Sequence, residues 1–206
     1  MSKSLHTIIF STILAVVCAL LLTGASQVLK PRREANQKAE QIRNILSVLG
    51  VPVQAETGAM ELLKIFDEVV KVEEQGEVTF YKYIPDKQTG KVEVVAVPFE
   101  GPGLWGPIRG FLSLDTPMEK IRGISFYQQE ETPGLGGDIA EKPFRSQFTG
   151  KSVKSAAGQL GIRIKRPSET LIDNNEVHGI SGATITCDKV ELMLNGTIKK
   201  VSEGRK

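Results

Sequence analysis

The sequence predicts an α+β fold, an antiparallel β-sheet flanked by helices, preceded by one N-terminal transmembrane helix. The first observation is that residues 4–29 contain no Asp, Glu, Lys or Arg. The second is a change of period after residue 70, from helical spacing to short β-rich runs divided by turn signals. The third is a return to helical spacing from residue 190 onward. We therefore divide the chain into an anchor (1–30), a juxtamembrane helix and linker (31–57) and one domain (58–206).

The N-terminal stretch is long enough to cross a membrane, because about 20 apolar residues in a helix span the hydrocarbon core. We interpret it as a retained anchor. A cleaved secretory signal is the alternative, with residues 23–25 (Thr-Gly-Ala) as its cleavage site. A lipoprotein signal at Cys18 fits less well, since the bulky Val17 precedes it. The basic residues 30–33 outnumber Lys3, which favours a cytoplasmic domain, but that rule is weak for large translocated domains.

Helical spacing predicts three further helices, at 34–50, at 59–70 and over the last residues, where Val190, Met193, Leu194, Ile198 and Val201 recur. The residues between them predict strands. The β-rich runs lie at 78–80, 92–94, 111–114 and 121–126, and turn signals divide them at 85–90 (Pro85-Asp86 and Thr89-Gly90), 101–107 and 115–117.

Composition excludes several kinds of function. Lys and Arg total 26 and Asp and Glu total 24, a net charge of +2, so no nucleic-acid partner is expected. Two Cys and two His, with Cys18 and His6 in the apolar stretch, do not supply a four-ligand zinc site, and we predict no metal site. Residues 101–106 spell G-x-G-x-x-G, but Pro107 and the β-rich residues that follow do not open a helix as a dinucleotide site requires. No side chain is expected to act as a catalytic acid or base.

Two segments carry the candidate chemistry. Residues 131–137 follow a strand and hold three glycines in four positions, which suits either a ligand-binding loop or a plain strand-to-helix connection. Residues 181–186 precede the last helix. They suit either an ordinary N-cap run or a phosphate site, because helix N-terminal amides attract anions. These residues alone do not decide between the alternatives.

The two segments together resemble the signatures of the covalent FMN-binding domain family. That family includes the C subunit of the Na+-translocating NADH–quinone reductase and the G subunit of the Rnf complex. Ser181, Gly182, Ala183, Thr184 and Thr186 match the S-G-A-T-x-T/S signature, Glu131, Thr132, Gly134, Leu135 and Gly136 match the upstream signature, and Leu104 with Trp105 resembles the reductase protein. The single anchor and its Leu-Lys-Pro-Arg exit (29–32) are similar as well.

The resemblance implies that FMN is bound covalently, as a phosphoester on Thr186. An FMN transferase would attach it with FAD as the donor. The phosphate would then lie at the start of the last helix. Glu131, Thr132, Leu135 and Gly136 would line the ring or ribityl chain, with Leu104 and Trp105 nearby.

The resemblance also implies a function, an electron-transfer subunit of a membrane NADH–quinone reductase that pumps Na+, without an NADH site of its own. Its partners would be the other subunits, the transferase and the membrane. The domain would lie on the periplasmic side of the bacterial inner membrane, contrary to the local charge count. The Rnf G subunit, a scaffold subunit without flavin and a free-standing envelope flavoprotein are the alternatives; residues 104–105 favour the reductase.

One position departs from the family pattern. The family carries Asp three residues before the signature serine, and here His178 stands there. Either the transferase attaches FMN less efficiently here, or another acid such as Asp173 takes the place of the family's Asp. Cys187, next to the acceptor, is interpreted as a tolerated small residue, since a redox thiol needs a partner.

Overall fold

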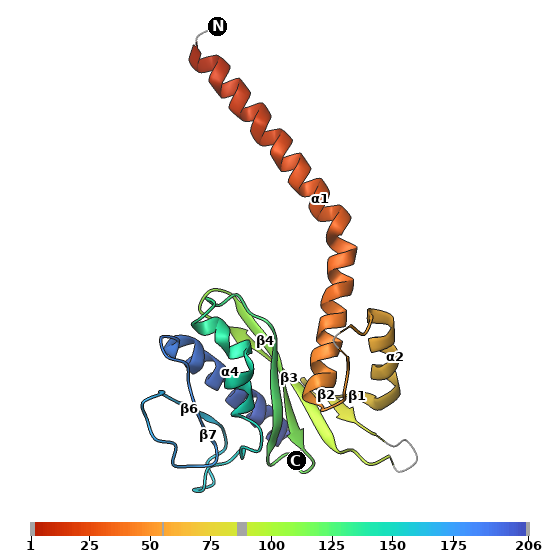
Figure 1. The fold of residues 1–206 in the computed structure, drawn as a ribbon, viewed down its shortest axis with the longest axis vertical. Coiled ribbons are helices and arrows are strands. Elements are labelled where there is room, and N and C mark those ends of the chain that lie inside the picture. Colours follow the sequence, from red (N-terminus) through yellow and green to blue (C-terminus); the bar gives the residue numbers. More distant parts are fainter. Residues whose placement is uncertain (1–2, 55, 86–89, 205–206) are drawn as a thin grey trace. The chain divides into compact units, whose positions relative to one another are not determined.

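The computed structural model describes residues 3–54, 56–85 and 90–204 of the chain. The chain divides into two compact units, residues 1–39 and residues 40–206. Helix α1 (Lys3–Val48) supplies the described part of the first unit, and its last nine residues belong to the second. Figure 1 shows the elements in chain order.

The first unit is helical and apolar. Within the described residues, α1 is the one helix long and apolar enough to cross a membrane, and none of its most apolar stretch is buried within the chain. The Thr12 hydroxyl donates a hydrogen bond to the Ile8 carbonyl at 2.9 Å. This bond pairs the hydroxyl with a carbonyl one helical turn earlier in the same helix.

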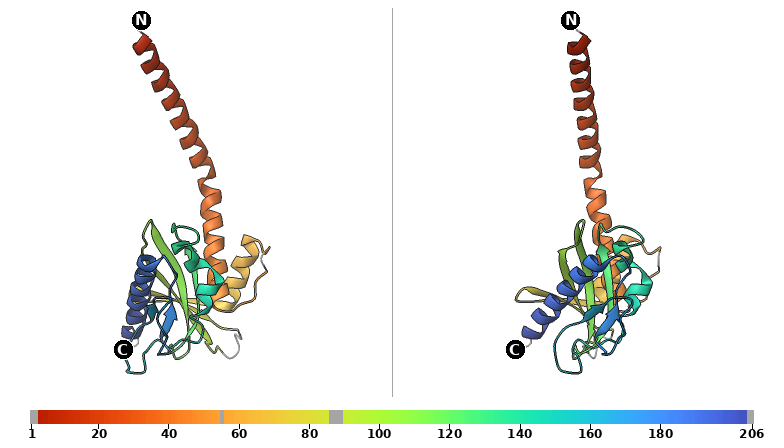
Figure 2. Two further views of the ribbon diagram at one scale, coloured as in Figure 1. Left: turned by 60° about the vertical axis from the view of Figure 1, so that its left-hand side comes forward. Right: turned by 90° about the vertical axis from the view of Figure 1, so that its left-hand side faces the viewer.

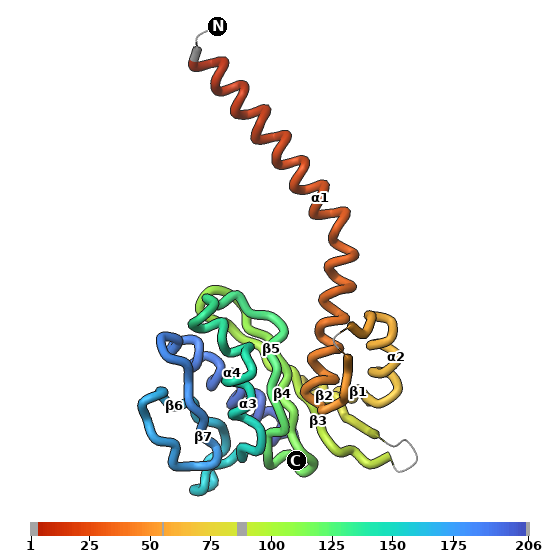
Figure 3. Tube along the Cα trace, viewed as in Figure 1, coloured from red at the N-terminus to blue at the C-terminus, as the bar shows by residue number. Residues whose placement is uncertain are grey.

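The second unit is built on a five-stranded antiparallel sheet in which each strand pairs with the next in the chain. The strands are β1 (Val70–Gln75), β2 (Val78–Tyr83), β3 (Val94–Pro102), β4 (Pro107–Asp115) and β5 (Ile121–Gln128). Beyond β5 the chain forms a 3-10 turn, η1 (Gly136–Ala140), and the short helix α3 (Lys142–Ser146), which Figure 3 shows beside the sheet. A separate parallel pair joins β6 (Arg163–Lys165) and β7 (Glu176–His178).

Both faces of the sheet are covered, because strand side chains alternate between its two sides. Along β3, Val95 and Val97 pack in the larger core with Val190 and Leu194 of helix α4 (Thr184–Glu203). Val94 and Ala96 pack on the opposite face with Ile45 and Val48 at the end of α1 and with Leu49 just after it. Phe66 of α2 (Ala59–Val69) adjoins this second core. The two views in Figure 2 show α4 on one face of the sheet and α2 on the other.

The α+β prediction is confirmed, and the differences lie in the bounds and number of the elements. Val70 begins β1 rather than ending a helix, and β1 itself was not predicted. The strand expected at 92–94 begins only at Val94. The turn expected at 101–107 is narrower, since β3 runs to Pro102 and β4 begins at Pro107. Helix α3 and the β6–β7 pair, both very short, were also not predicted. Asp86 and Thr89, two of the expected turn residues, lie outside the described residues.

Candidate functional site

A single buried carboxylate connects three distant segments of the chain. Glu131, 5% exposed, lies in the loop that follows β5. Its Oε2 accepts a hydrogen bond from the Thr186 hydroxyl at 2.5 Å. Its Oε1 accepts the backbone N–H of Leu104 at 2.7 Å and that of Trp105 at 3.1 Å. The loops around residues 104, 131 and 186, which the sequence marks separately, therefore form one site.

The start of α4 places Thr186 inward. The helix begins at Thr184, the preceding residue is Ala183, and no side chain caps the helix. Its first backbone bond runs from the Cys187 N–H to the Ala183 carbonyl at 2.9 Å, so the N–H groups of residues 184–186 have no acceptor within the helix. Thr186 is 2% exposed. Among the described residues no side chain caps these amides, which leaves them available for an anion.

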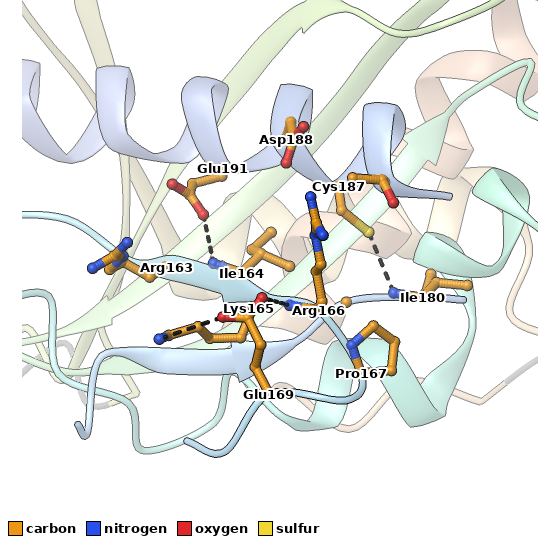
Figure 4. Close-up of a pocket in the computed structure, with 12 residues that line it drawn as sticks. Arg163, Ile164, Lys165, Arg166, Pro167, Glu169, Ile180, Cys187, Asp188 and Glu191 are labelled. Atoms are coloured by element: carbon orange, nitrogen blue, oxygen red, sulfur yellow. Dashed lines mark hydrogen bonds and ion pairs between the residues drawn. The ribbon is translucent and has the colours of Figure 1, made fainter. Parts of the chain in front are cut away.

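The two threonines of this turn have different surroundings. Thr184 is exposed and lines a pocket of about 250 Å³ between α4 and β6. In Figure 4, Arg166 points from the end of β6 toward the helix, and the Ile180 N–H bonds the Cys187 sulfur. Thr186 is not among the residues that line this pocket and instead faces Glu131. The two hydroxyls therefore differ in environment, although both lie in one helical turn.

Gly136 has no side chain, and this leaves space for the hydrogen-bonded side chains of Glu131 and Thr186. A Cβ added at Gly136 would lie 2.6 Å from the Thr186 Oγ1 and 2.8 Å from the Glu131 Oε2. Gly134 has another role, since it adopts a φ of +76° with open space around it and donates its N–H to Asp138 at 2.9 Å. Gly134 therefore serves the conformation of the loop, whereas Gly136 allows a close approach of the two side chains.

The apolar side chains of the site are unusually exposed. Leu104 is 48% and Trp105 69% exposed, in the turn between β3 and β4, where a hollow of about 580 Å³ lies. Leu135 lies against the backbone at Gly182, where an added Cβ would come within 2.8 Å of the leucine Cδ2. Ile185 of the first turn of α4 is exposed as well. Exposed apolar groups that adjoin a polar, buried centre suit a ligand with a flat apolar part and an anionic part.

The remaining predicted residues lie around this centre. The carbonyl of Thr132 accepts the N–H groups of Leu135, at 3.1 Å, and Gly137, at 2.9 Å, which closes the loop into a tight turn. Ser181 and Gly182 are exposed in the turn before α4, and Gly182 has a φ of +76°. Within the described residues no cluster of His, Cys, Asp or Glu suited to a metal ion is found.

His178 and Cys187 flank the start of α4. The backbone N–H and carbonyl of His178 bond the Gln147 side chain at 2.9 and 3.1 Å, while its Nδ1 is buried and has no hydrogen-bond partner within the described residues. Burial raises the pKa of the Cys187 thiol, the Ile180 N–H opposes this and Asp188 adds to it. The carboxylate of Asp173 bonds the N–H of Ala156 at 2.8 Å.

Sequence reasoning placed Glu131 at the cofactor but missed its contact with Thr186. No local signal reports that contact, because the two residues are 55 positions apart. The residues present fit an FMN group: unpaired helix amides and small residues suit its phosphate, and the exposed apolar side chains suit its ring.

Comparison with known proteins finds a matching domain family and related reductase subunits. Residues 103–199 match the FMN-binding domain family. The chain is 28% identical to the C subunit of the Na(+)-translocating NADH-quinone reductase of Yersinia pestis, over 96% of this chain and 93% of that protein. It is 40% identical to the same protein of Chlamydia trachomatis, over 50% of this chain and 38% of that one.

Two solved structures share the fold. The crystal structure of the corresponding Na(+)-translocating NADH-quinone reductase protein from Parabacteroides distasonis superposes with a TM-score of 0.71 at 24% identity, over 85% of this chain and 96% of that one. The crystal structure of Shewanella oneidensis NqrC gives a TM-score of 0.66 at 23% identity, over 78% of this chain and 91% of that one.

Proposed function

We propose that this chain, a member of the NqrC family of Na(+)-translocating NADH-quinone reductase subunits with an FMN-binding domain at 103–199, carries FMN covalently on Thr186. In this proposal it is an electron-transfer subunit of a membrane reductase that oxidises NADH, reduces quinone and moves Na+. The observation that carries the proposal is the buried hydrogen bond between Thr186 and Glu131, which lies within the FMN-binding domain and joins both signature loops.

The chain's own residues would divide the work of binding. The free N–H groups at the start of α4, with Gly182 and Ala183 beside them, would hold the phosphate, since the helix dipole favours an anion there. Leu104, Trp105 and Leu135 would pack against the flavin ring and keep water from it. When bound, the flavin supplies the one- and two-electron redox chemistry, which no protein side chain provides.

The proposal includes a place for the protein. Helix α1 would hold the chain in the bacterial inner membrane as a single-pass anchor, with the domain on the periplasmic side. The partners would be the other subunits of the reductase and, during maturation, an FMN transferase. The length and apolar surface of α1 support the anchor, and the names of the relatives support the complex.

The attachment site is tested by substitution in the full-length chain, co-expressed with the transferase. Thr186→Val keeps the shape but lacks the hydroxyl, so we expect no covalent flavin on a folded, membrane-inserted protein. Thr186→Ser should still accept flavin. Thr184→Val should reduce loading without moving the attachment point. Intact mass, peptide mapping and fluorescence that survives denaturation measure the result; flavin on Thr184 or Ser181 would contradict the assignment.

A further inference from the structure

We propose that Glu131 is the base of flavin attachment: it orients the Thr186 hydroxyl and takes its proton as the phosphoester forms. This inference rests on the proposed function, because it concerns the same threonine. It assigns to a residue of the modified chain a part of the chemistry that would otherwise be ascribed entirely to the transferase.

The hydrogen bonds of the Glu131 carboxylate fix its orientation and direct one oxygen, Oε2, at Thr186. Oε1 is held by two backbone N–H groups, from Leu104 and Trp105, so the carboxylate cannot rotate without losing them. Oε2 faces the Thr186 Oγ1 at 2.5 Å, within the reach a general base requires. All three partners donate, and the carboxylate only accepts.

The surroundings of the pair favour this role over simple structural pairing. Both side chains are buried, and within the described residues Glu131 forms no ion pair with Lys, Arg or His. A buried carboxylate without a cation is costly unless its hydrogen bonds offset the loss of water. Gly136 adds to the argument, since any side chain there would occupy the space beside both oxygens.

The reaction balances without an oxidant or a reductant. A bond forms between the Thr186 Oγ and the phosphorus of the FMN half of FAD. The bond from that phosphorus to the bridging oxygen breaks, and AMP leaves with the electron pair. The hydroxyl proton passes to the Glu131 Oε2 and from there to water. Because Thr186 is 2% exposed, FAD reaches it only after groups around it move, and the hydrogen bond to Glu131 keeps the hydroxyl oriented meanwhile.

The test measures initial rates of covalent incorporation into the full-length chain in detergent, with purified transferase and FAD, at a single pH. We expect Glu131→Gln to lower the rate by about 100-fold or more, the usual contribution of a general base. Glu131→Asp keeps the carboxylate on a shorter chain and should restore part of the rate. Glu130→Gln, the same change at the exposed neighbouring position, should react like the parent.

Rescue by the conservative variant separates proton transfer from a structural role. The amide oxygen of Glu131→Gln can still accept the two backbone N–H groups, but the amide cannot take a proton from Thr186. Glu131→Asp keeps the carboxylate and should therefore react faster than Glu131→Gln. If Glu131→Gln does not fold, Glu131→Asp decides, with covalent flavin expected at a rate below that of the parent.

Two results would overturn the inference: a parent-like rate in Glu131→Gln, or a folded Glu131→Asp variant that reacts no faster than Glu131→Gln. The Thr186→Val variant shows whether a negative result concerns the role of Glu131 or the attachment site itself. If Thr186→Val accepts flavin, the attachment site is wrong. If it does not, while Glu131→Gln reacts like the parent, only the role of Glu131 is wrong.

Discussion

The residues of the site differ from an ordinary core in that a charged side chain and a hydroxyl are buried together. Glu131 and Thr186 are among the few buried polar side chains of the described chain, and they bond each other. Such a buried pair is compatible with a stable fold only if all its hydrogen bonds form. A buried polar group without a partner lowers the free energy of unfolding by about 1–3 kcal/mol. Single atoms near this pair should therefore affect function strongly.

Gly136 provides such a test. In Gly136→Ala the new methyl group would lie within 2.8 Å of both oxygens of the pair, so the hydroxyl must turn away from the carboxylate. We expect covalent flavin loading to fall by about 10-fold or more, since the acceptor loses its orientation. Intact mass after co-expression with the transferase measures it.

Gly134→Ala is the matched control in the same loop. It meets no atom within 4 Å but has a φ of +76°, which costs an L-residue about 1 kcal/mol. A fall of about 2–4 °C in the melting temperature is expected, with loading kept. Equal loading defects in both variants would mean that the loop acts only through its backbone.

Cys187 should be inert although it adjoins the acceptor. Burial raises the pKa of its thiol, and the thiolate is the reactive form. In the folded chain we expect iodoacetamide at pH 8 to leave Cys187 unmodified over a time that fully modifies it in urea. Peptide mass mapping reads each cysteine separately. Rapid alkylation in the folded chain would contradict the buried placement.

At the scale of elements, Glu176 connects the short β6–β7 pair to residues 172–173, which precede β7. Glu176 of β7 accepts the N–H of Ile172 at 2.8 Å and that of Asp173 at 3.3 Å, and Lys165 of β6 lies 3.6 Å away. The Ile172 N–H is the main cause that lowers the pKa of Glu176 below its ordinary value of 4.5, and burial opposes it. The folded chain therefore binds this proton less readily than the unfolded chain.

This predicts an acid-dependent stability. With a lowered pKa in the folded state, the contribution of Glu176 is fully present above about pH 4.5 and is lost as the pH falls through the folded pKa. Glu176→Gln lacks that contribution. We expect its urea midpoint to lie below that of the parent at pH 7 and the gap to shrink by pH 3.5, in the detergent-solubilised full chain.

Glu169→Gln is the control for that experiment. Glu169 pairs with the same Lys165, at 3.7 Å, but is exposed, and surface pairs contribute about 0–1 kcal/mol. Its midpoint should stay near that of the parent at both pH values. A gap for Glu176→Gln that is the same at pH 7 and pH 3.5 would refute the linkage.

For the whole molecule, the main prediction is that residues 4–29 remain as one membrane-spanning helix with the domain outside the cytoplasm. The apolar length supports the span, and the proposed function supports the side, against the local charge count. A C-terminal alkaline phosphatase fusion should be active and a C-terminal green fluorescent protein fusion dark. The reverse pattern would place the domain in the cytoplasm, and a released soluble domain would identify a cleaved signal.

The domain boundaries at 1–30, 31–57 and 58–206 stay a prediction at this scale. The last residues of α1 pack in the second core with Ala96 and Phe111, so the compact unit begins at residue 40. Functional boundaries, such as the residues that contact other subunits, are a separate property and require cross-linking in the assembled complex.

The sequence by itself determined the elements whose signal is local. The apolar run before Lys30 specified a long helix, the 3.6-residue period specified α2 and α4, and the β-rich runs divided by turn signals specified strands of an antiparallel sheet. Each of these depends on near neighbours in the chain. The strands β6 and β7 were not predicted for the same reason, because three residues are too few to show a period of alternating side chains.

Only the tertiary structure decided how the candidate residues meet. Thr184 and Thr186 lie two residues apart near the start of the last helix, and Gly134 and Gly136 lie in one loop, so local sequence does not distinguish their roles. The order of the sheet brings the loop after β5, the β3–β4 turn and the start of α4 together. As a result the Glu131 carboxylate is hydrogen-bonded to the Thr186 hydroxyl, while Thr184 stays exposed. Contacts between residues 55 positions apart follow from the packing of whole elements, and no local pattern in the chain encodes them.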